Sequence, residues 1–389
     1  MIRRIYLDNN ATTPVLPDVL EAMRPYFGEH FGNASSIHHH GQETRAAVER
    51  ARDSVASSLG CRAPEIVFTS GGTESNNLAI AGLTSADDHV ITSGIEHHAV
   101  LHACKHLEEM GCEVTYVPVD GRSLVDSDDV RRALRPNTKL ISIMMANNET
   151  GVLQPVEEIG KIAEEADVYF HIDAVQAAAK VPIDVKRIAC DALSISGHKI
   201  HAPQGVGVLY VRKGTHLQPL FYGGRHERSR RAGTENVPGI VALGKAAELA
   251  MQGFERGEDK KMSALRDRLQ VGILAQVEEA GVNGEGAPRV PNTTNIYFDH
   301  IEGEAMVISL DLKGLAVSTG AACSSGAIEP SHVLTAMGLH VDRARASIRF
   351  SLGKQNTAED IDFALVLVPE AVARLRELSP VYKKKAVTF

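Results

Sequence analysis

Several short segments of this 389-residue chain carry side chains that could do chemistry, and the first is a glycine turn. Residues 68–77, Phe-Thr-Ser-Gly-Gly-Thr-Glu-Ser-Asn-Asn, run from a strand-like stretch through two glycines into a helix-like stretch. Glycines let the backbone approach an anion, and a helix N-terminus offers free N–H groups and a favourable dipole. Gly72 and Thr73 could therefore hold a phosphate, although the same pattern also suits a capped helix after a tight turn.

A carboxylate and a lysine follow two further apolar stretches. Asp173 could be paired with a cation, or it could cap the next helix. Lys199, in Ser-Gly-His-Lys, could form a Schiff base if its ammonium is partly desolvated, or it could be a solvated loop lysine. Taken together, a phosphate cradle, an aspartate and a lysine 26 residues later (199 − 173) are the groups that pyridoxal phosphate requires.

A histidine and a cysteine add possible proton transfer and nucleophilic chemistry. His97 follows the strand-like residues 89–92 and could lie over a planar cofactor ring, or merely hydrogen-bond within a loop. Cys323 lies among small residues between Gly320 and Gly326. In an exposed loop, such a thiol is suited to nucleophilic attack. The other cysteines, which lie within or beside apolar segments and are interpreted as buried, are Cys61, Cys104, Cys112 and Cys190.

The elements that must position these groups alternate between strands and helices. Between them, apolar residues recur three and four apart, as at Val100, Cys104 and Leu107. This alternation predicts βαβ units and a mostly parallel sheet, whose ligands bind at the carboxyl ends of the strands. The predicted strands are 65–69, 89–92, 113–117, 139–145, 168–172, 192–196 and 206–211.

The remainder of the chain predicts a second, α+β unit. We expect a large domain over 15–262, a small domain over 263–389, and an N-terminal segment, 1–14, whose strand at 3–7 packs with the small domain. The predicted helices are 238–251, 261–280, 304–312, 332–337 and 358–378, and the predicted strands of the second unit are 294–298 and 346–351.

Composition narrows the class of protein. A hydrophobic fraction of 43% and a charged fraction of 23% exclude a disordered chain, a collagen and a disulfide-rich miniprotein. The net charge of −8, with no basic domain, argues against nucleic-acid binding. Apolar runs fall short of the roughly 18 residues that span a bilayer, and no secretory signal is recognisable, so a cytoplasmic protein without membrane segments is expected.

Over nearly its whole length the chain resembles the NifS/IscS-type cysteine desulfurases, which are pyridoxal-phosphate enzymes of aminotransferase class V. The matching segments are 6–13, 32–36, 70–77, 96–97, 147–151, 171–176, 196–199, 231–234, 320–323 and 347–353. The resemblance implies an α/β fold of type I: a large domain with a mostly parallel seven-stranded sheet, a smaller α+β C-terminal domain, and assembly as a homodimer.

The resemblance also assigns roles by position. Lys199 would bond to the cofactor, Asp173 would pair with its pyridine nitrogen, and His97 would stack on its ring. Arg349 would grip the substrate carboxylate, and Cys323 would carry a persulfide. The remaining cofactor contacts would be Gly72, Thr73, Ser196 and His198 at the phosphate, Thr234 at the phosphate of the neighbouring subunit, and Asn148 and Gln176 on the ring-oxygen side.

The implied reaction removes sulfur from L-cysteine, gives L-alanine, and passes the sulfur to an acceptor such as an iron–sulfur scaffold protein. A transaminase would share the cofactor groups without needing Cys323. A selenocysteine lyase would share nearly every residue, and a non-enzymatic sulfur carrier would need the thiol alone. No metal site is expected, because three adjacent histidines at 38–40 are not suited to face one ion together.

Overall fold

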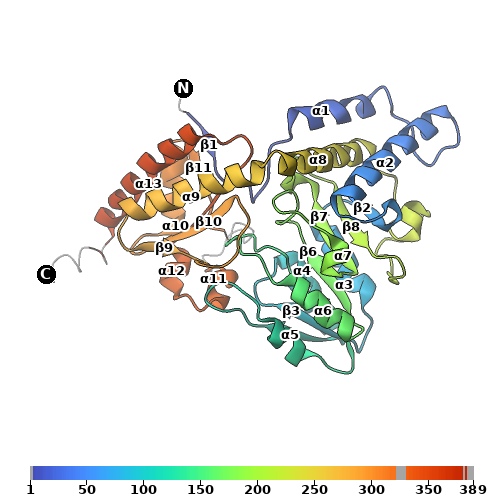
Figure 1. Ribbon diagram of the computed structural model, residues 1–389, viewed down its shortest axis with the longest axis horizontal. Helices are drawn as coiled ribbons and strands as arrows, with labels where there is room; N and C mark the ends of the chain where they lie inside the picture. The colour runs from blue at the N-terminus through green and yellow to red at the C-terminus, as the bar shows by residue number, and fades with distance from the viewer. Residues whose placement is uncertain (1–2, 321–329, 380–381, 383–389) are drawn as a thin grey trace.

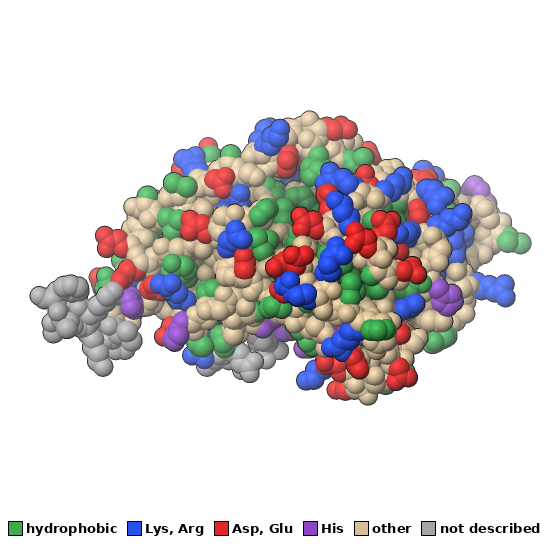
Figure 2. Space-filling view, turned by 60° about the horizontal axis from the view of Figure 1, so that its bottom comes forward, with side chains coloured by type: hydrophobic (Ala, Val, Ile, Leu, Met, Phe, Trp, Pro, Cys, Tyr) green, Lys and Arg blue, Asp and Glu red, His purple; other side chains and the backbone are tan. Residues whose placement is uncertain are grey.

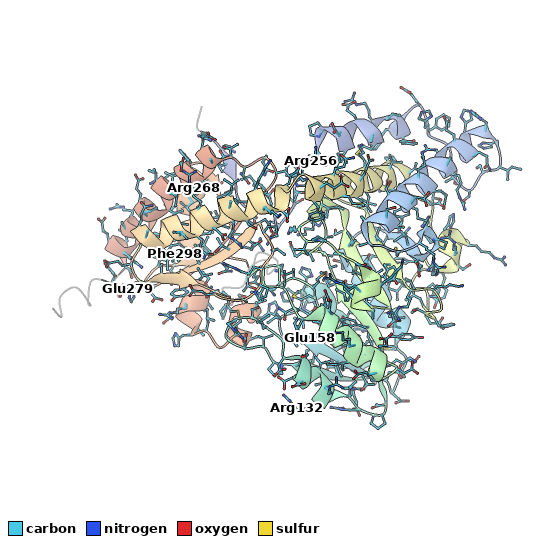
Figure 3. All side chains as sticks on the ribbon, viewed as in Figure 1. Arg132, Glu158, Arg256, Arg268, Glu279 and Phe298 are labelled. Atoms are coloured by element: carbon cyan, nitrogen blue, oxygen red, sulfur yellow. The ribbon has the colours of Figure 1, made fainter. Side chains whose placement is uncertain are left out.

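The computed structural model describes residues 3–320, 330–379 and 382, so Cys323 lies outside the described residues. Figure 1 shows two lobes joined along the top by two helices that run nearly end to end, α8 (Val237–Glu255) and α9 (Glu258–Gln276). Gly257, between them, has a φ of 66°, a left-handed conformation that glycine adopts without strain. Arg256, which follows α8 directly, marks this junction in Figure 3.

The larger lobe is built on a seven-stranded sheet in the order β2-β8-β7-β6-β5-β3-β4. The strand β8 pairs antiparallel with both β2 and β7, whereas the other neighbouring strands are parallel. The predicted α/β fold with a mostly parallel seven-stranded sheet is thus confirmed. The strands are β2 (Ile66–Thr69), β3 (His89–Ser93), β4 (Glu113–Val117), β5 (Thr138–Ser142), β6 (Tyr169–Asp173), β7 (Ala192–Ser196) and β8 (Gly207–Val211).

Helices cover both faces of this sheet, which explains the continuous apolar character of its strands. Neighbouring residues of β2 point to opposite faces: Val67 joins a core with α3 (Gly72–Leu83) and α4 (His98–Glu109), while Phe68 joins the core on the other face. The remaining helices of this lobe are α1 (Pro17–Met23), α2 (His39–Ser58), α5 (Ser127–Ala133), α6 (Val156–Glu165) and α7 (Val185–Ile188).

The smaller lobe has its own sheets and core. Three of its strands form an antiparallel sheet in the order β12-β10-β9, and β1 (Ile5–Tyr6) pairs in parallel with β11 (Leu315–Ala316). Phe298, fully buried at the end of β10, packs in the core of this lobe (Figure 3). The remaining elements are β9 (Ala280–Val282), β10 (Thr293–Phe298), β12 (Ser347–Ser351), α10 (Gly303–Leu312), α11 (His332–Ala336), α12 (Val341–Arg345) and α13 (Ala358–Leu378).

The main differences from the predicted elements concern β5, α9 and α2. The strand β5 ends at Ser142 rather than at 145, and α9 ends at Gln276 because residues 280–282 form β9. The 20-residue helix α2 was not predicted. Its contact with α8 uses small residues: a Cβ on Gly244 would come 2.6 Å from the Cα of Ala51. Such packing leaves only a weak hydrophobic period in the sequence.

In the part of the chain that the structure describes, no helix combines the length and the apolar character needed to cross a membrane. On the face that Figure 2 presents, Lys and Arg side chains are interspersed with Asp and Glu side chains.

Candidate active site

A cavity lies at the carboxyl ends of the parallel strands, where the two lobes meet. Groups from β6, β7 and the start of α3 line it, together with Arg349 from the smaller lobe. The structure therefore brings together most of the predicted site residues. Those that line the cavity are Gly72, Thr73, His97, Asn148, Asp173, Gln176, Ser196, His198, Lys199 and Arg349.

The glycine turn allows the first turn of α3 to lie close to the ends of β6 and β7. A Cβ on Gly72 would come 2.8 Å from Cγ2 of Val175 and 3.4 Å from Cβ of Ser196. Thr73, the next residue of the helix, is exposed toward the cavity that it lines. Free N–H groups of this first turn, with the hydroxyls of Thr73 and Ser196 nearby, make the turn suited to an anion.

Asp173 ends β6 as a buried carboxylate whose two oxygens are both hydrogen-bonded. Oδ2 accepts a 2.7 Å hydrogen bond from Nδ2 of Asn76, and Oδ1 accepts one from the backbone N–H of Val175 at 3.0 Å. Asn76 also lines the cavity, and its own Oδ1 is buried without a partner among the described residues. These contacts fix the position of a carboxylate at the floor of the cavity.

Lys199 follows β7 in a short 3₁₀ turn, Gly197–Lys199. Its ammonium donates to the carbonyl oxygens of Asn10, at 2.5 Å, and Ala11, at 2.7 Å. The N-terminal segment is held over this turn because Thr13 donates its N–H and its hydroxyl to the carbonyl of His198. The lysine therefore projects into a site that is closed on one side by the beginning of the chain.

The two site histidines are neutral imidazoles at neutral pH. His97 caps α4, because its Nδ1 accepts a hydrogen bond from the N–H of Ala99 at 3.1 Å, which leaves the ring proton on Nε2. Burial lowers the pKa of His97, and Lys199 lowers it further, while Asp173 acts in the opposite direction. Burial and the charge of Lys199 lower the pKa of His198 to about 4.

Arg349 reaches the cavity from β12 with much of its guanidinium already engaged. Its Nη2 forms an ion pair with Asp8 at 2.7 Å, and its Nη1 donates to the carbonyl of Asn148 at 3.0 Å. Its Nε is buried and has no hydrogen-bond partner among the described residues. Burying an unpaired donor costs free energy, so this N–H is available to an anionic ligand.

Two of the predicted residues are not brought into this cavity by the described chain. Thr234 is exposed and does not line it. Cys323 lies outside the described residues, although Gly320 lines the cavity. Burial raises the pKa of each other thiol, to about 12 for Cys61 and Cys104, with Cys112 and Cys190 also raised.

Three residues with clear contacts at the site were given no role from the sequence: Asn10, Asn76 and Lys180. Asn10 lines the cavity, and Lys180 donates a 2.6 Å hydrogen bond to Oε1 of Gln176. The spacing of Gln176 and Lys180, four residues apart after a strand end, was a usable signal for Lys180. Nothing local in the sequence marks Asn10, because its partners are 138 or more residues away.

Comparison with known proteins gives consistent matches over the full length. The model of the family described as aminotransferase class-V matches residues 5–363. A protein named cysteine desulfurase IscS from Dictyoglomus turgidum is 49% identical, over 99% of this chain and 98% of that protein. Another of that name from Methanosarcina thermophila is 51% identical, over 100% and 96%.

Two solved structures support the same relationship. One titled NifS-like protein superposes with a TM-score of 0.88 at 38% identity and covers 96% of this chain and 100% of that one. Another, titled SspA in complex with cysteine, superposes with a TM-score of 0.78 at 38% identity, over 89% and 98%.

Proposed function

Because the chain belongs to the aminotransferase class-V family, we propose that it is a cysteine desulfurase, which takes sulfur from L-cysteine and releases L-alanine. The observation that carries this proposal is the convergence of an anion-binding turn, a fixed carboxylate and a lysine in one cavity with a buried arginine. Each of these groups matches a part of the cofactor or of an amino-acid substrate.

The residues present fit pyridoxal phosphate. Gly72, Thr73, Ser196 and His198 would hold its phosphate, and the close approach of Gly72 to Val175 and Ser196, which leaves no room for a Cβ, supports this placement. Asp173 would face the pyridine nitrogen. Bound there, the cofactor supplies an electron sink for the α-carbon of an amino acid. Asn148 and Gln176 would contact its ring-oxygen side, and His97 would stack on its ring.

Within this account, the side chains of the cavity move protons and orient the substrate. The Nζ of Lys199, as a neutral amine, accepts the proton of the substrate α-carbon. Arg349 holds the substrate carboxylate through its unpartnered Nε and through Nη2, which Asp8 releases to the substrate. The Nε2 proton of His97 is available to the leaving sulfur or to the attacking thiol.

Cys323 is the proposed nucleophile. Its thiolate would attack the substrate sulfur, form an S–S bond, and break the substrate C–S bond, whose electron pair stays with the carbon skeleton that is protonated and leaves as alanine. Three residues of chain span at most about 11 Å, so position 323 is within covalent reach of Gly320 at the cavity. The raised pKa values of the other four thiols disfavour their thiolates.

We further propose a homodimer in which Thr234 contacts the phosphate bound to the neighbouring subunit. An exposed position for Thr234 is what such a contact needs. Large apolar side chains are exposed in two segments near Thr234. Residues 221–222 belong to the segment beside it, and residues 27–37 belong to the segment that shares a pocket with its loop. These side chains are Phe27, Phe31, Ile37, Phe221 and Tyr222.

The proposed domain division is 1–14, 15–262 and 263–389, in which the N-terminal segment packs with the small domain. Ile5 and Leu7 share a hydrophobic core with β10, β12 and α13, which supports this division. We propose that the enzyme acts in the cytoplasm and hands its sulfur to an acceptor protein such as an iron–sulfur scaffold.

The proposed function is tested by incubating the purified, cofactor-loaded protein with L-cysteine or L-selenocysteine and measuring alanine. A cysteine desulfurase releases alanine from cysteine with a stoichiometric gain of protein-bound sulfur. Alanine from selenocysteine alone would instead identify a selenocysteine lyase, and amino transfer to a keto acid would identify a transaminase. A chain that bound sulfur but released no alanine from either substrate would be a sulfur carrier.

A further inference from the structure

Glu149 is a buried acidic residue beside the cavity, and the proposed reaction gives it no role. It belongs to the turn 147–151 after β5 and is 2% exposed. The turn is fixed by its own hydrogen bonds, because Oδ1 of Asn147 accepts the backbone N–H groups of Glu149 and Thr150, both at 2.9 Å. The carbonyl of Glu149 accepts from Nδ2 of Asn295 at 3.2 Å. The side chain of Glu149 therefore projects from a firmly held backbone.

This side chain contacts both residues that flank the segment 321–329, which carries Cys323. Its Oε2 accepts a 2.5 Å hydrogen bond from the hydroxyl of Ser331, a buried residue on the C-terminal side of the segment. Gly320 lies on the N-terminal side, and a Cβ at this position would come 3.0 Å from the same Oε2 of Glu149. One carboxyl oxygen of the larger lobe therefore lies against the chain on both sides of the segment.

The two flanking residues are also tied to other parts of the site. The N–H of Gly320 donates to Oγ of Ser318 at 3.0 Å, and Ser318 exchanges backbone hydrogen bonds with Arg349. Ser331 caps α11, because its Oγ accepts the N–H of Leu334 at 3.2 Å. The helix α11 in turn packs in a hydrophobic cluster with residues that follow β3 and β5 of the larger lobe (Figure 1). Both flanks are thus held at defined positions relative to Arg349.

We propose that Glu149 is a positioning residue for sulfur transfer: the length of its side chain sets the positions of Gly320 and Ser331, and so the place from which Cys323 reaches the substrate. The proposal rests on the proposed function, in which Cys323 forms an S–S bond while the substrate C–S bond breaks and its electron pair stays on carbon. Such an attack depends steeply on distance, and a misplacement of about 1 Å can lower a rate by up to about a hundredfold.

Two variants of the cofactor-loaded protein separate the length of this side chain from its charge. Glu149→Asp keeps the carboxyl group but is shorter by one C–C bond, about 1.5 Å, so it cannot contact both flanks. The kcat for alanine release should fall about tenfold or more, while the Kd for L-cysteine, measured from the absorbance change of the bound cofactor, should change less than about twofold.

Glu149→Gln keeps the length and an oxygen that accepts from Ser331. Burial raises the pKa of Glu149, with Ser331 and Arg349 acting in the opposite direction, and a raised pKa favours the uncharged carboxyl that glutamine resembles. The kcat of Glu149→Gln should therefore stay within about threefold of the wild-type value.

Glu158→Asp is the matched control. Oε2 of Glu158 accepts the hydroxyl of Ser127 at 3.1 Å, and neither residue lines the cavity (Figure 3 labels Glu158). Its kinetics should equal those of wild type. Hydrogen exchange followed by mass spectrometry gives a readout that does not depend on turnover. Peptides that cover α11 should exchange about tenfold faster in Glu149→Asp, because the cap residue Ser331 loses its contact, and at the wild-type rate in Glu149→Gln and in the control.

Ser331→Ala serves if Glu149→Asp fails to fold. It removes the hydroxyl that Glu149 contacts and should lower kcat about threefold or more with unchanged cysteine binding. Because both changes break the same contact, the double variant should be no slower than Glu149→Asp alone.

A wild-type kcat in folded Glu149→Asp, an equal loss in the Asp and Gln variants, or a loss confined to cysteine binding would overturn the proposal. Fully additive losses in the double variant would overturn it as well. A wild-type protein that releases no alanine and gains no sulfur on Cys323 would instead defeat the proposed function, and this proposal with it.

Discussion

Asn76 and Asp173 form a buried pair in which the amide of Asn76 donates a 2.7 Å hydrogen bond to Oδ2 of the carboxylate. Asn76 comes from the helix that begins at the anion-binding turn, and Asp173 ends the neighbouring strand β6. The contact therefore ties the proposed phosphate site to the carboxylate that would face the pyridine nitrogen, so that one helix would orient both ends of the proposed cofactor.

Asn76→Ala should bind the cofactor but turn over about tenfold more slowly. Loss of the hydrogen bond to the Asp173 carboxylate removes roughly 1.5 kcal/mol of the free energy that holds this carboxylate in position. The effect should appear in kcat rather than in KM. Asn77→Ala is the matched control, since that neighbouring amide donates only to the backbone carbonyls of Thr73 and Ala99. Equal kinetics for wild type and Asn76→Ala would show that Asp173 is positioned without this contact.

Gly72→Ala should weaken cofactor binding by tenfold or more. The added Cβ would lie 2.8 Å from Cγ2 of Val175, a β-branched side chain that cannot easily turn away. We expect the turn to shift and unfolding stability to fall by about 1–3 kcal/mol. A Cβ at Gly28 meets nothing within 4 Å, so Gly28→Ala is the control. Cofactor titration and thermal melts of both variants test this prediction. Wild-type cofactor affinity in Gly72→Ala would contradict a phosphate site at this turn.

Much of this site follows from residue order, because groups at the ends of successive parallel strands must meet at one edge of the sheet. Asp173 and Lys199 were predicted together for that reason, and both line the cavity. The contact of Asn10 with Lys199 spans 189 positions and depends on how the chain start crosses the junction of the lobes. No local pattern carries that information. The helix α2 was missed for a different reason, since valine is the largest aliphatic side chain on its buried face, which otherwise consists of Gly, Ala, Thr and Arg.

Glu96→Gln should stabilise the protein more at pH 8 than at pH 5. Burial raises the pKa of Glu96 to about 8, although Ser93 and the N–H of Met144 hydrogen-bond to its Oε1. The folded state therefore keeps this carboxyl protonated while the unfolded chain ionises above its ordinary pKa, so stability falls as pH rises from about 4.5 to about 8. Glutamine cannot ionise and removes that loss.

Thermal melts of wild type and Glu96→Gln across this range check the sign. The difference in melting temperature, variant minus wild type, should grow from pH 5 to pH 8. Glu157→Gln, on the exposed side of α6, is the control whose difference should stay flat. A difference that is constant or shrinks with rising pH would show that Glu96 is ionised in the fold.

Arg349→Lys should raise the KM for cysteine about tenfold or more with a smaller effect on kcat. A lysine supplies one ammonium in place of a planar fork, and it cannot keep the Asp8 and Asn148 contacts while also binding a carboxylate. Arg343→Lys, at an exposed pair with Asp299, tests whether any arginine of the small lobe has this effect. An unchanged KM for Arg349→Lys would remove it from the substrate site.

Cys323→Ser tests the central claim, that a cofactor site built on Lys199 delivers sulfur to this thiol. The serine variant should fold and load cofactor normally, because the side chains are similar in size, and should lose at least about 99% of alanine release, because a hydroxyl is a far weaker nucleophile at neutral pH. Serine variants of Cys61 and Cys190 provide controls with unchanged activity.

The most direct measurement is the mass of the peptides after the wild-type protein has been incubated with L-cysteine and its thiols have been blocked. The account predicts a gain of one sulfur atom on the peptide that contains Cys323 and none on the peptides of the other four cysteines. Sulfur on any of those four peptides in place of Cys323, or alanine release that persists in Cys323→Ser, would contradict it.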